Sequence, residues 1–423
     1  MEASPLTINI QNSIEVPPLK NDPFILEGTP FTTSFDNTEI AFRYKSDSEL
    51  RKAYILFSSI QSNLLVKIGP SLVNWALKVG VPIRPLLKYY FFDQFCGGET
   101  LEACLPKIET LKNYNVKTIL DYGVESLKTE QGYNQCAEEI IKTITFASSH
   151  KNIPFVAMKI TGIGGTETLE KISSGKASEY DKLQFQKIKD RLVRICEVAK
   201  QLQQPIFIDA EESWIQPAID SLCEEMMFNY NTQQPLIFTT IQMYRNDRWQ
   251  YLHYLKEKAA QQKIFIGIKL VRGAYIEKEN KRASQLGYPT PLYISKKNVD
   301  LAFNNAAHLL IKNIDSIAFC AGTHNEESCL LLATYAQKAG IPFDHPHLSF
   351  SQLYGMSDQI TFNLAEKGFN VAKYIPFGPL DAVLPYLFRR AQENTSIAGQ
   401  TSKELILLEK EIRRRKKAAL ISK

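Results

Sequence analysis

The chain has 423 residues, of which 44% are apolar and 22% charged, and this length predicts either two domains or one large barrel with additions. The net charge is only +5, and no basic groove interleaved with aromatic residues occurs, so nucleic acid is not an expected partner. Seven scattered cysteines without a Cys-x-x-Cys pair favour a reducing compartment and argue against structural zinc.

Residues 1–110 are expected to form an N-terminal extended and helical region. Residues 1–23 contain acids and prolines but no basic segment followed by an apolar run, so we expect neither a secretory signal nor a transit peptide, and hence a cytoplasmic protein. Residues 53–92 are the most apolar stretch, yet Lys67, Pro70 and Lys78 interrupt it. This pattern predicts packed helices rather than a membrane crossing.

Residues 111–400 are predicted to form an α/β domain, a (β/α)8 barrel of the TIM type. Short β-branched runs alternate there with longer segments of helical periodicity. The eight runs are 117–121, 154–160, 205–209, 236–241, 265–271, 316–321, 348–353 and 371–375. Eight buried strands alternating with helices favour a closed barrel. A doubly wound open sheet is the alternative, but Gly162-Ile-Gly-Gly165 lacks the third glycine of a dinucleotide fingerprint.

Polar residues follow seven of these strands at their carboxyl ends, which form the catalytic face of a barrel. They are Asp121, Glu125, Lys159, Thr161, Asp209, Glu211, Glu212, Gln242, Tyr244, Lys269, Arg272, Thr323, His324 and Tyr374. Each one alone is explained as an ion pair or a cap. Their common position indicates a functional site, because chance would scatter polar residues over both ends of the strands.

The stretch from Tyr386 to Glu393 carries a second signal. Helical spacing brings Tyr386, Arg389, Arg390 and Glu393 onto one face. Two guanidinium groups beside an aromatic ring suit a small carboxylate whose other end is apolar. The alternative is a solvated basic turn in which Arg389 pairs with Glu393.

Together these segments resemble proline dehydrogenases over roughly residues 90–400. The resemblance rests on five motifs and three longer strings. The motifs are Leu120-Asp-Tyr-Gly-Val-Glu125, Ile208-Asp-Ala-Glu-Glu212, Lys269-Leu-Val-Arg-Gly-Ala-Tyr275, Gly322-Thr-His-Asn325 and Tyr386-x-x-Arg-Arg-x-x-Glu393. The strings Gln216-Pro-Ala-Ile219, Pro235-Leu-Ile-Phe238 and Arg389-Arg-Ala-Gln-Glu-Asn394 are similar to the mitochondrial-type branch. No aldehyde dehydrogenase segment follows, so a monofunctional form is expected.

The resemblance implies a flavoprotein of proline catabolism on a distorted (β/α)8 barrel. Its expected reaction is the FAD-dependent oxidation of L-proline to 1-pyrroline-5-carboxylate, with electrons passed to a membrane quinone. By similarity, Arg389, Arg390 and Lys159 bind the substrate carboxylate, Tyr275, Tyr374 and Tyr386 wall its ring, and Asp209 orients the polar network. Hydroxyproline-preferring relatives have a smaller residue at the position of Tyr374, which implies a preference for proline.

The resemblance also implies which residues hold the flavin. They are Gln242, Lys269, Val271, Gly273, Tyr293, Lys297, Thr323, His324 and Glu393. Many bacterial relatives have arginine where this chain has Lys269, so a bidentate contact is not expected there. The segment Tyr293-Ile-Ser-Lys-Lys297 also departs from the family's threonine-rich pattern.

Other function classes stay open at this point. Lys159 at the second strand's end fits a Schiff-base lyase, and the carboxylate clamp fits a non-catalytic amino-acid-binding barrel. Asp344-His-Pro-His347 has two histidines but no third ligand in sequence, which favours a loop over a metal site.

The tail, residues 401–423, is predicted to form a basic helix that contains Arg413-Arg-Arg-Lys-Lys417. A solvated terminal helix is the simpler interpretation. The functional one is peripheral contact with the inner face of a membrane, in the mitochondrion if the source is eukaryotic.

Overall fold

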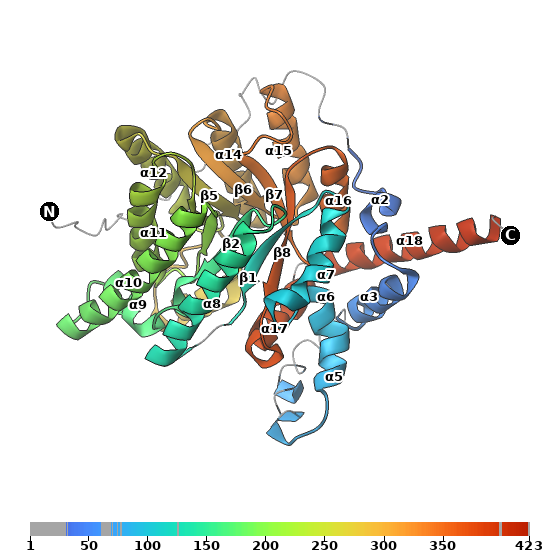
Figure 1. Ribbon diagram of the computed structural model, residues 1–423, viewed down its shortest axis with the longest axis horizontal. Coiled ribbons are helices and arrows are strands. Elements are labelled where there is room, and N and C mark those ends of the chain that lie inside the picture. Colours follow the sequence, from blue (N-terminus) through green and yellow to red (C-terminus); the bar gives the residue numbers. More distant parts are fainter. Residues whose placement is uncertain are drawn as a thin grey trace. The chain divides into compact units, whose positions relative to one another are not determined.

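The structure, a computed structural model, describes residues 31, 33–60, 69, 71–73, 75–76, 78–124, 127–396 and 400–421, and their side chains except those of 391–396 and 400–402. Eight parallel strands close into one barrel in chain order (Figure 1). Their bounds are β1 (Lys117–Tyr122), β2 (Phe155–Lys159), β3 (Ile206–Asp209), β4 (Ile237–Gln242), β5 (Ile266–Val271), β6 (Ile317–Gly322), β7 (Leu348–Leu353) and β8 (Val371–Phe377). The predicted fold class is confirmed, and the predicted strand ends differ from these by at most two residues.

Helices connect and cover the strands. Between β1 and β8 they are α8 (Glu130–Ser148), the 3-10 turn η3 (Ile160–Gly162), α9 (Thr166–Ser173), α10 (Glu179–Leu202), α11 (Gln216–Tyr230), α12 (Arg248–Gln262), α13 (Ile276–Leu286), α14 (Lys296–Lys312), α15 (Glu326–Lys338) and α16 (Asp358–Glu366). Three of them begin at side-chain caps, because the hydroxyl or amide oxygens of Thr129, Ser295 and Asn325 accept from backbone amides in the first turns of α8, α14 and α15.

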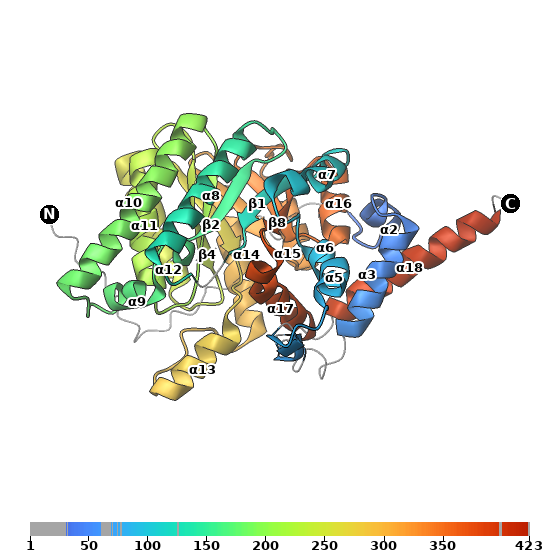
Figure 2. The same cartoon turned by 60° about the horizontal axis from the view of Figure 1, so that its bottom comes forward.

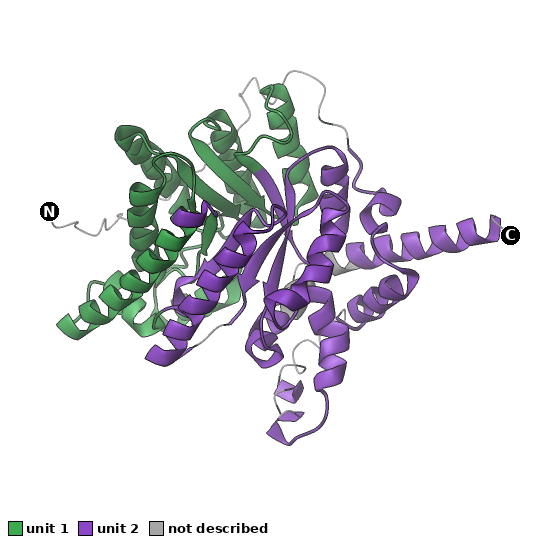
Figure 3. Cartoon of the chain, viewed as in Figure 1, with its two compact units in different colours: residues 1–31, 164–200, 205–348 green, residues 32–163, 201–204, 349–423 purple. Residues whose placement is uncertain are grey.

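The chain divides into two compact units, which are coloured separately in Figure 3. Unit 1 contains residues 1–31, 164–200 and 205–348, and unit 2 contains residues 32–163, 201–204 and 349–423. In unit 1, β4 and β5 are buried along almost their whole length, since parallel strands have helices on one face and the barrel interior on the other. Figure 2 shows α13 at the edge of unit 1, away from α10 and α11.

Unit 2 contains the helices that precede and follow the barrel. These are α2 (Thr38–Phe42), α3 (Asp47–Ile60), α5 (Arg84–Leu87), the π-helical turn η2 (Lys88–Phe92), α6 (Asp93–Phe95), α7 (Leu101–Lys112), α17 (Leu380–Ser396) and α18 (Gln400–Ile421). α3 buries Leu50, Ala53, Phe57 and Ile60, which recur every three or four residues and so form one helical stripe.

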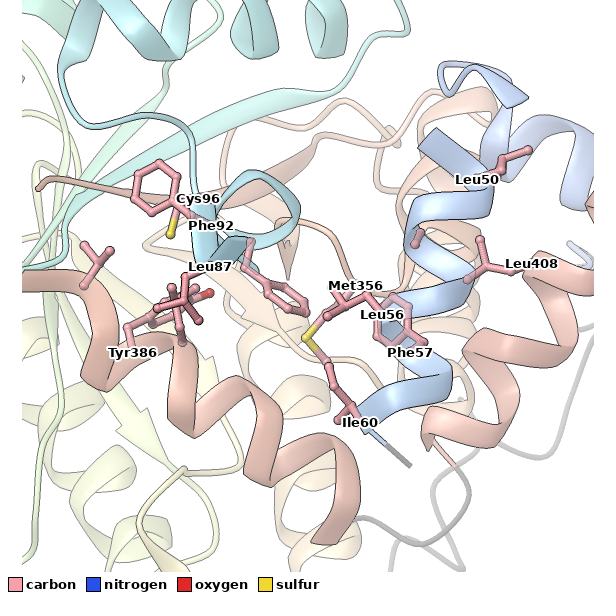
Figure 4. Close-up of a cluster of buried hydrophobic side chains, with 14 of the residues drawn as sticks. Leu50, Leu56, Phe57, Ile60, Leu87, Phe92, Cys96, Met356, Tyr386 and Leu408 are labelled. Carbon is pink, nitrogen blue, oxygen red and sulfur yellow. The ribbon is translucent and has the colours of Figure 1, made fainter. Parts of the chain in front are cut away.

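That stripe packs into a hydrophobic cluster in unit 2 (Figure 4). Phe92 and Cys96 come from the turns before α7, Met356 from the segment after β7, and Tyr386 from α17. Side chains of α18 such as Leu408 complete the cluster. Burial of these large side chains holds the N- and C-terminal helices of unit 2 together, at roughly 1.5–3 kcal/mol for each fully buried one.

The arginines of the basic run of α18 are engaged in ion pairs. Arg415 donates to Glu411 and Asp47 and to the backbone carbonyls of Phe42 and Lys45. Glu411 also accepts two hydrogen bonds from Arg414, at 2.8 and 2.9 Å. These contacts hold α18 against α2 and the start of α3. Within the part of the chain that the structure describes, no helix has both the length and the apolarity to cross a membrane.

Candidate functional site

In unit 1, an ion pair links the carboxyl ends of β3 and β5. The Lys269 ammonium lies 2.6 Å from the Asp209 carboxylate, and both side chains are about nine-tenths buried. Lys269 is in register with Thr240 on β4. Because the pair is largely withdrawn from water, each charge stabilises the other. Both residues were expected at the site from their positions in the sequence, but their pairing was not.

Gln242 and Gly273 lie beside this pair on β4 and just after β5. The Gln242 side-chain amide donates to the carbonyl of Glu211 at 2.7 Å. Gly273 has a φ of 127°, and a Cβ at this position would lie 2.4 Å from the ring of Tyr244. Only glycine fits here, because both the backbone angle and the aromatic neighbour exclude a side chain. The backbone therefore packs directly against the Tyr244 ring at this position.

Arg272 organises the next part of unit 1. Its guanidinium lies 4.4 Å from the centre of the Phe303 ring and donates to Asp300 at 2.9 Å. It also donates to the hydroxyls of Thr323 at 2.7 Å and Ser328 at 2.8 Å. Arg272 was expected at the strand end from the sequence, without a role. A charged residue directly after a buried strand was the signal available.

Tyr293 and Lys297 belong to the segment that enters α14. The Tyr293 amide donates to the carbonyl of Tyr244 at 2.8 Å, which ties this segment to the end of β4. Burial raises the pKa of the Tyr293 phenol, so the hydroxyl stays protonated at neutral pH. Lys297 is exposed in the first turn of α14, and His324 follows Thr323 directly after β6.

Two buried hydroxyl groups in unit 1 fit a polar ligand. The oxygens of Thr240 and Tyr293 are inaccessible to water and find no hydrogen-bond partner among the described residues. Buried polar atoms are nearly always satisfied in folded proteins, so an unpartnered one points to a missing group. Thr240 is in register with Lys269 on the neighbouring strand. A hydroxyl and an ammonium on β4 and β5 fit the polar edge of the flavin that the sequence leads us to expect.

In unit 2, the residues proposed for the substrate begin with Lys159 at the end of β2. Its ammonium lies 3.5 Å from the carboxylate of Asp121 on β1. Asp121 is in register with Ala157, so the Asp121 and Lys159 side chains point to the same side of the sheet. Tyr374 on β8 is in register with Ile119, which places its ring on that side as well. Glu125, also proposed at this face, lies outside the described residues.

The predicted face of α17 forms in part. The Arg390 guanidinium lies 5.1 Å from the centre of the Tyr386 ring, and both side chains are buried. This is the geometry of a cation–π contact between residues four apart on a helix. Arg389 is half-buried one position earlier. The side chain of Glu393 lies outside the described residues, so the predicted contact with it stays a prediction.

The two histidines of residues 344–347 contact the backbone. The His345 ring nitrogen accepts from the amide of His347 at 3.2 Å, and the His347 ring bonds the carbonyl of Ile314 at 2.7 Å. These contacts agree with the loop interpretation.

A comparison with protein families decides the broader assignment. The model of the family described as proline dehydrogenase matches residues 104–403, which is well over half of the chain. The chain belongs to the proline dehydrogenase family. Members of this family are enzymes and oxidoreductases, so the recognition made from the motifs is confirmed.

Curated relatives include mitochondrial proline dehydrogenases. Proline dehydrogenase 1 of Dictyostelium discoideum is 31% identical, with 88% of this chain and 73% of that protein covered. Proline dehydrogenase 2 of Arabidopsis thaliana is 32% identical, with 87% of each chain covered. The similarity to the mitochondrial-type branch is therefore also confirmed.

Solved structures show the same fold. Proline utilization A from Bdellovibrio bacteriovorus superposes with a TM-score of 0.67 at 21% identity, and the match covers 89% of this chain and 40% of that one. The protein of the same name from Bradyrhizobium japonicum gives a TM-score of 0.65 at 17% identity, over 90% of this chain and 48% of that one. At these identities the likeness concerns the fold alone.

Proposed function

We propose that this protein oxidises L-proline to 1-pyrroline-5-carboxylate with FAD as its cofactor. The observation that carries the proposal is the family match over residues 104–403. The reaction removes a hydride from the ring carbon that is bonded to nitrogen and does not carry the carboxylate. The nitrogen releases a proton to water. Bound FAD supplies the acceptor for the hydride.

The chain's own contribution is to hold the substrate. In the proposal, Arg389, Arg390 and Lys159 bind the carboxylate, and Tyr275, Tyr374 and Tyr386 wall the apolar ring. The stacking of Arg390 on Tyr386 supports this, because it fixes a buried guanidinium beside an aromatic surface. A charge-assisted clamp on one end of the ring orients the reacting carbon without any acid or base.

Asp209 and Lys269 are proposed to act through position and charge. Their buried pair holds an ammonium near the carboxyl end of β5. We propose that Gln242, Lys269, Val271 and Gly273 hold FAD with Tyr293, Lys297, Thr323, His324 and Glu393. The unpartnered hydroxyl of Tyr293 supports the cofactor, because a bound polar group would satisfy it.

The acceptor, the compartment and the domain ranges complete the proposal. Electrons leave to a membrane quinone, and the protein contacts the membrane peripherally. The compartment is the cytoplasm, or the mitochondrion if the source is eukaryotic. The printed names of the relatives from Dictyostelium discoideum and Arabidopsis thaliana favour the mitochondrion. Residues 111–400 form the catalytic barrel, 1–110 the N-terminal region and 401–423 the basic C-terminal helix.

A related substrate is the second candidate. The relatives also include a hydroxyproline dehydrogenase of Xenopus laevis, 27% identical, and the carbapenem antibiotics biosynthesis protein CarD of Pectobacterium carotovorum, 33% identical. Tyr374 is bulky and buried, which favours an unsubstituted ring. The lyase alternative would leave the pair of Arg389 and Arg390 beside three tyrosines unexplained.

One experiment tests the proposal. The purified protein is expected to be yellow and to lose its flavin absorbance when L-proline is added without oxygen. Borohydride trapping of a substrate adduct on Lys159 would favour the lyase instead. Colourless protein that still binds proline would favour a non-catalytic binding barrel.

A further inference from the structure

One stretch of the N-terminal region has an unusual charge composition. From Leu50 to Phe92, 43 residues contain no aspartate or glutamate, although the whole chain has 45 acidic residues in 423. The same stretch contains six basic residues, namely Arg51, Lys52, Lys67, Lys78, Arg84 and Lys88. The stretch itself therefore carries no carboxylate that an anionic surface would repel.

Its middle part exposes large apolar side chains. Residues 71–73, 75–76 and 78 are helical, and Leu72, Trp75 and Val79 are 59%, 59% and 55% exposed. The spacing of three and four residues puts these three on one face. Val73 and Ala76 face the other way, since Val73 packs against the hydrophobic cluster of unit 2 and Ala76 is buried. The segment is thus apolar on its inner and outer faces alike.

After a turn at Val79 and Gly80, the chain leads toward α5. Val81, Leu86 and Tyr89 are exposed as well. We call these three, with Leu72, Trp75 and Val79, the apolar patch. In Figure 1 the segment that leads into α5 lies at the lower edge of unit 2. Monomeric proteins rarely expose so many large apolar groups in one short segment unless the surface binds something.

The patch is fixed to the helix that carries the proposed substrate arginines. Ile83 and Leu87, from the same segment, pack into the cluster to which Leu384 and Leu387 of α17 belong. Arg84 also donates to Asp381 in the first turn of α17 at 2.8 Å. Whatever the patch contacts is therefore held close to α17 within unit 2.

We propose that the apolar patch is the surface by which this protein docks on an anionic lipid bilayer. The inference rests on the proposed function in one respect, because a membrane quinone as acceptor requires such contact. Tryptophan and tyrosine among aliphatic side chains, flanked by lysines, are typical of segments that lie in the interface plane. Lys78 is exposed and, among the described residues, unpaired, so it is available to lipid phosphates.

The C-terminal tail is the less suitable surface. Arg413, Arg414 and Arg415 are each paired with glutamate or aspartate side chains of unit 2. Charges that are already paired attract lipid headgroups less. The basic residues Lys52, Arg84 and Lys88 of the stretch that contains the patch are also paired, with Asp93, Asp381 and Glu99. The patch differs from the tail in its exposed apolar area, which lies beside the exposed Lys78.

Vesicle binding of the full-length holoprotein tests the proposal. The vesicles contain phosphatidylcholine with one-third phosphatidylglycerol, and co-sedimentation gives the partition coefficient. The double variant Leu72→Gln/Trp75→Gln is expected to lower this coefficient at least about tenfold, because two apolar groups no longer enter the interface. The matched control is Tyr180→Gln/Leu183→Gln on α10, whose two apolar side chains are 67% and 64% exposed, and it is expected to bind like the wild type.

A pair of charge reversals separates the patch from the tail. Lys78→Glu is expected to lower the partition coefficient at least about threefold at low salt. Lys417 of α18 is also exposed, and Lys417→Glu is expected to leave the partition coefficient unchanged. The proposal is overturned if the glutamine variant binds like the wild type, or if only Lys417→Glu weakens binding. It is also overturned if the wild type does not bind vesicles and sedimentation velocity shows that the wild type is a dimer whereas the patch variant is a monomer.

Proline oxidation with a soluble dye separates the two proposals. Normal dye activity in the patch variant together with lost vesicle binding supports the docking surface. Absent dye activity in the wild type rejects the proposed function, while the vesicle result still decides the docking surface.

Discussion

Arg390 illustrates how much one side chain depends on its neighbours. Its guanidinium is buried over the Tyr386 ring, and such a charge is stabilised only when an anion or other acceptors reach it. A substrate carboxylate would be one such anion. Arg389 is half-buried on the same helical turn, and its guanidinium could donate a second pair of hydrogen bonds to that carboxylate.

We expect Arg389→Met and Arg390→Met each to lower kcat/KM for proline by roughly 30- to 1000-fold, which corresponds to about 2–4 kcal/mol for a lost charged hydrogen bond. The flavin content should stay close to that of the wild type, because the substitutions remove substrate contacts. Steady-state kinetics and the flavin absorbance of the purified variants check this. Near-normal efficiency in both variants would show that the clamp is assigned wrongly.

Tyr374 is expected to set the choice between proline and its hydroxylated form. Its ring is buried on β8 on the same side of the sheet as Asp121 and Lys159. We predict that the wild type favours L-proline over trans-4-hydroxyproline, and that Tyr374→Ser shifts the ratio of the two kcat/KM values at least about tenfold toward hydroxyproline. The same kinetics with Tyr374→Phe serve as the control, since the ring remains. A wild type that prefers hydroxyproline contradicts the interpretation of the pocket.

The pair of Asp209 and Lys269 predicts a measurable coupling. Lys269→Met leaves a buried carboxylate without its partner 2.6 Å away, so the free energy of unfolding should fall by about 3–5 kcal/mol. In the double variant Asp209→Leu/Lys269→Met, most of this loss should be recovered, because no buried charge is left unpaired. Denaturant unfolding of the two single variants and the double variant measures the coupling. Additive losses would mean that the two groups do not interact.

At the scale of elements, α18 is held by a buried carboxyl group. Glu404 accepts from the amide of Ser357 at 2.6 Å, just before α16. Burial, and next the Asp358 carboxylate, raise the pKa of Glu404 to about 7, while Lys373 and Lys45 act in the opposite direction. Lys373 and Asp358 form their own buried pair at 2.8 Å. The protonated form of Glu404 is therefore favoured by folding.

The direction of the pH effect follows from proton binding. Between the ordinary pKa of a glutamate, about 4.3, and about 7, the folded state keeps a proton on Glu404 that the unfolded state has released. The free energy of unfolding therefore falls as pH rises through this window. We expect Glu404→Gln to keep the hydrogen bond to Ser357, to remove this part of the pH dependence and to stabilise the protein at pH 8 by about 1–3 kcal/mol.

Unfolding midpoints at pH 5, 6, 7 and 8 check the Glu404 prediction, with Glu409→Gln on the exposed side of α18 as the control. A variant that is less stable than the wild type at pH 8 would contradict it. The comparison also reports on α18 as an element, because Leu407 and Leu408 pack beside Glu404 in the same helix.

At the scale of the whole molecule, the cofactor is expected to contribute to stability. A ligand that binds only the folded state raises the free energy of unfolding by about 2.7 kcal/mol at a hundredfold excess over its Kd. Removal of FAD should therefore lower the thermal midpoint by several degrees, and added FAD should restore it. Riboflavin at the same concentration is the control. A midpoint that does not respond to FAD would argue against the cofactor assignment.

The sequence by itself determined the barrel. Strands that are buried on both faces read as continuous apolar runs, so residues such as 206–209 and 237–242 were visible without any tertiary information. The position of Asp209, Gln242 and Lys269 at strand ends was visible for the same reason. The helical face of Tyr386 and Arg390 followed from local spacing, since residues four apart on a helix are neighbours.

Only the tertiary structure decided which of these groups meet. Asp209 and Lys269 are sixty residues apart, and nothing in local periodicity specifies their contact. The hydrogen bonds from the Arg272 guanidinium to Thr323 and Ser328 likewise depend on β5 and β6 being neighbours. The basic run at residues 413–417 has the composition of a solvated helix, yet its arginines hold α18 to α2 and α3. The local sequence determines which side chains share one face of a helix or strand. The partners of those side chains are determined by the tertiary fold, because it brings together elements that are distant in the sequence.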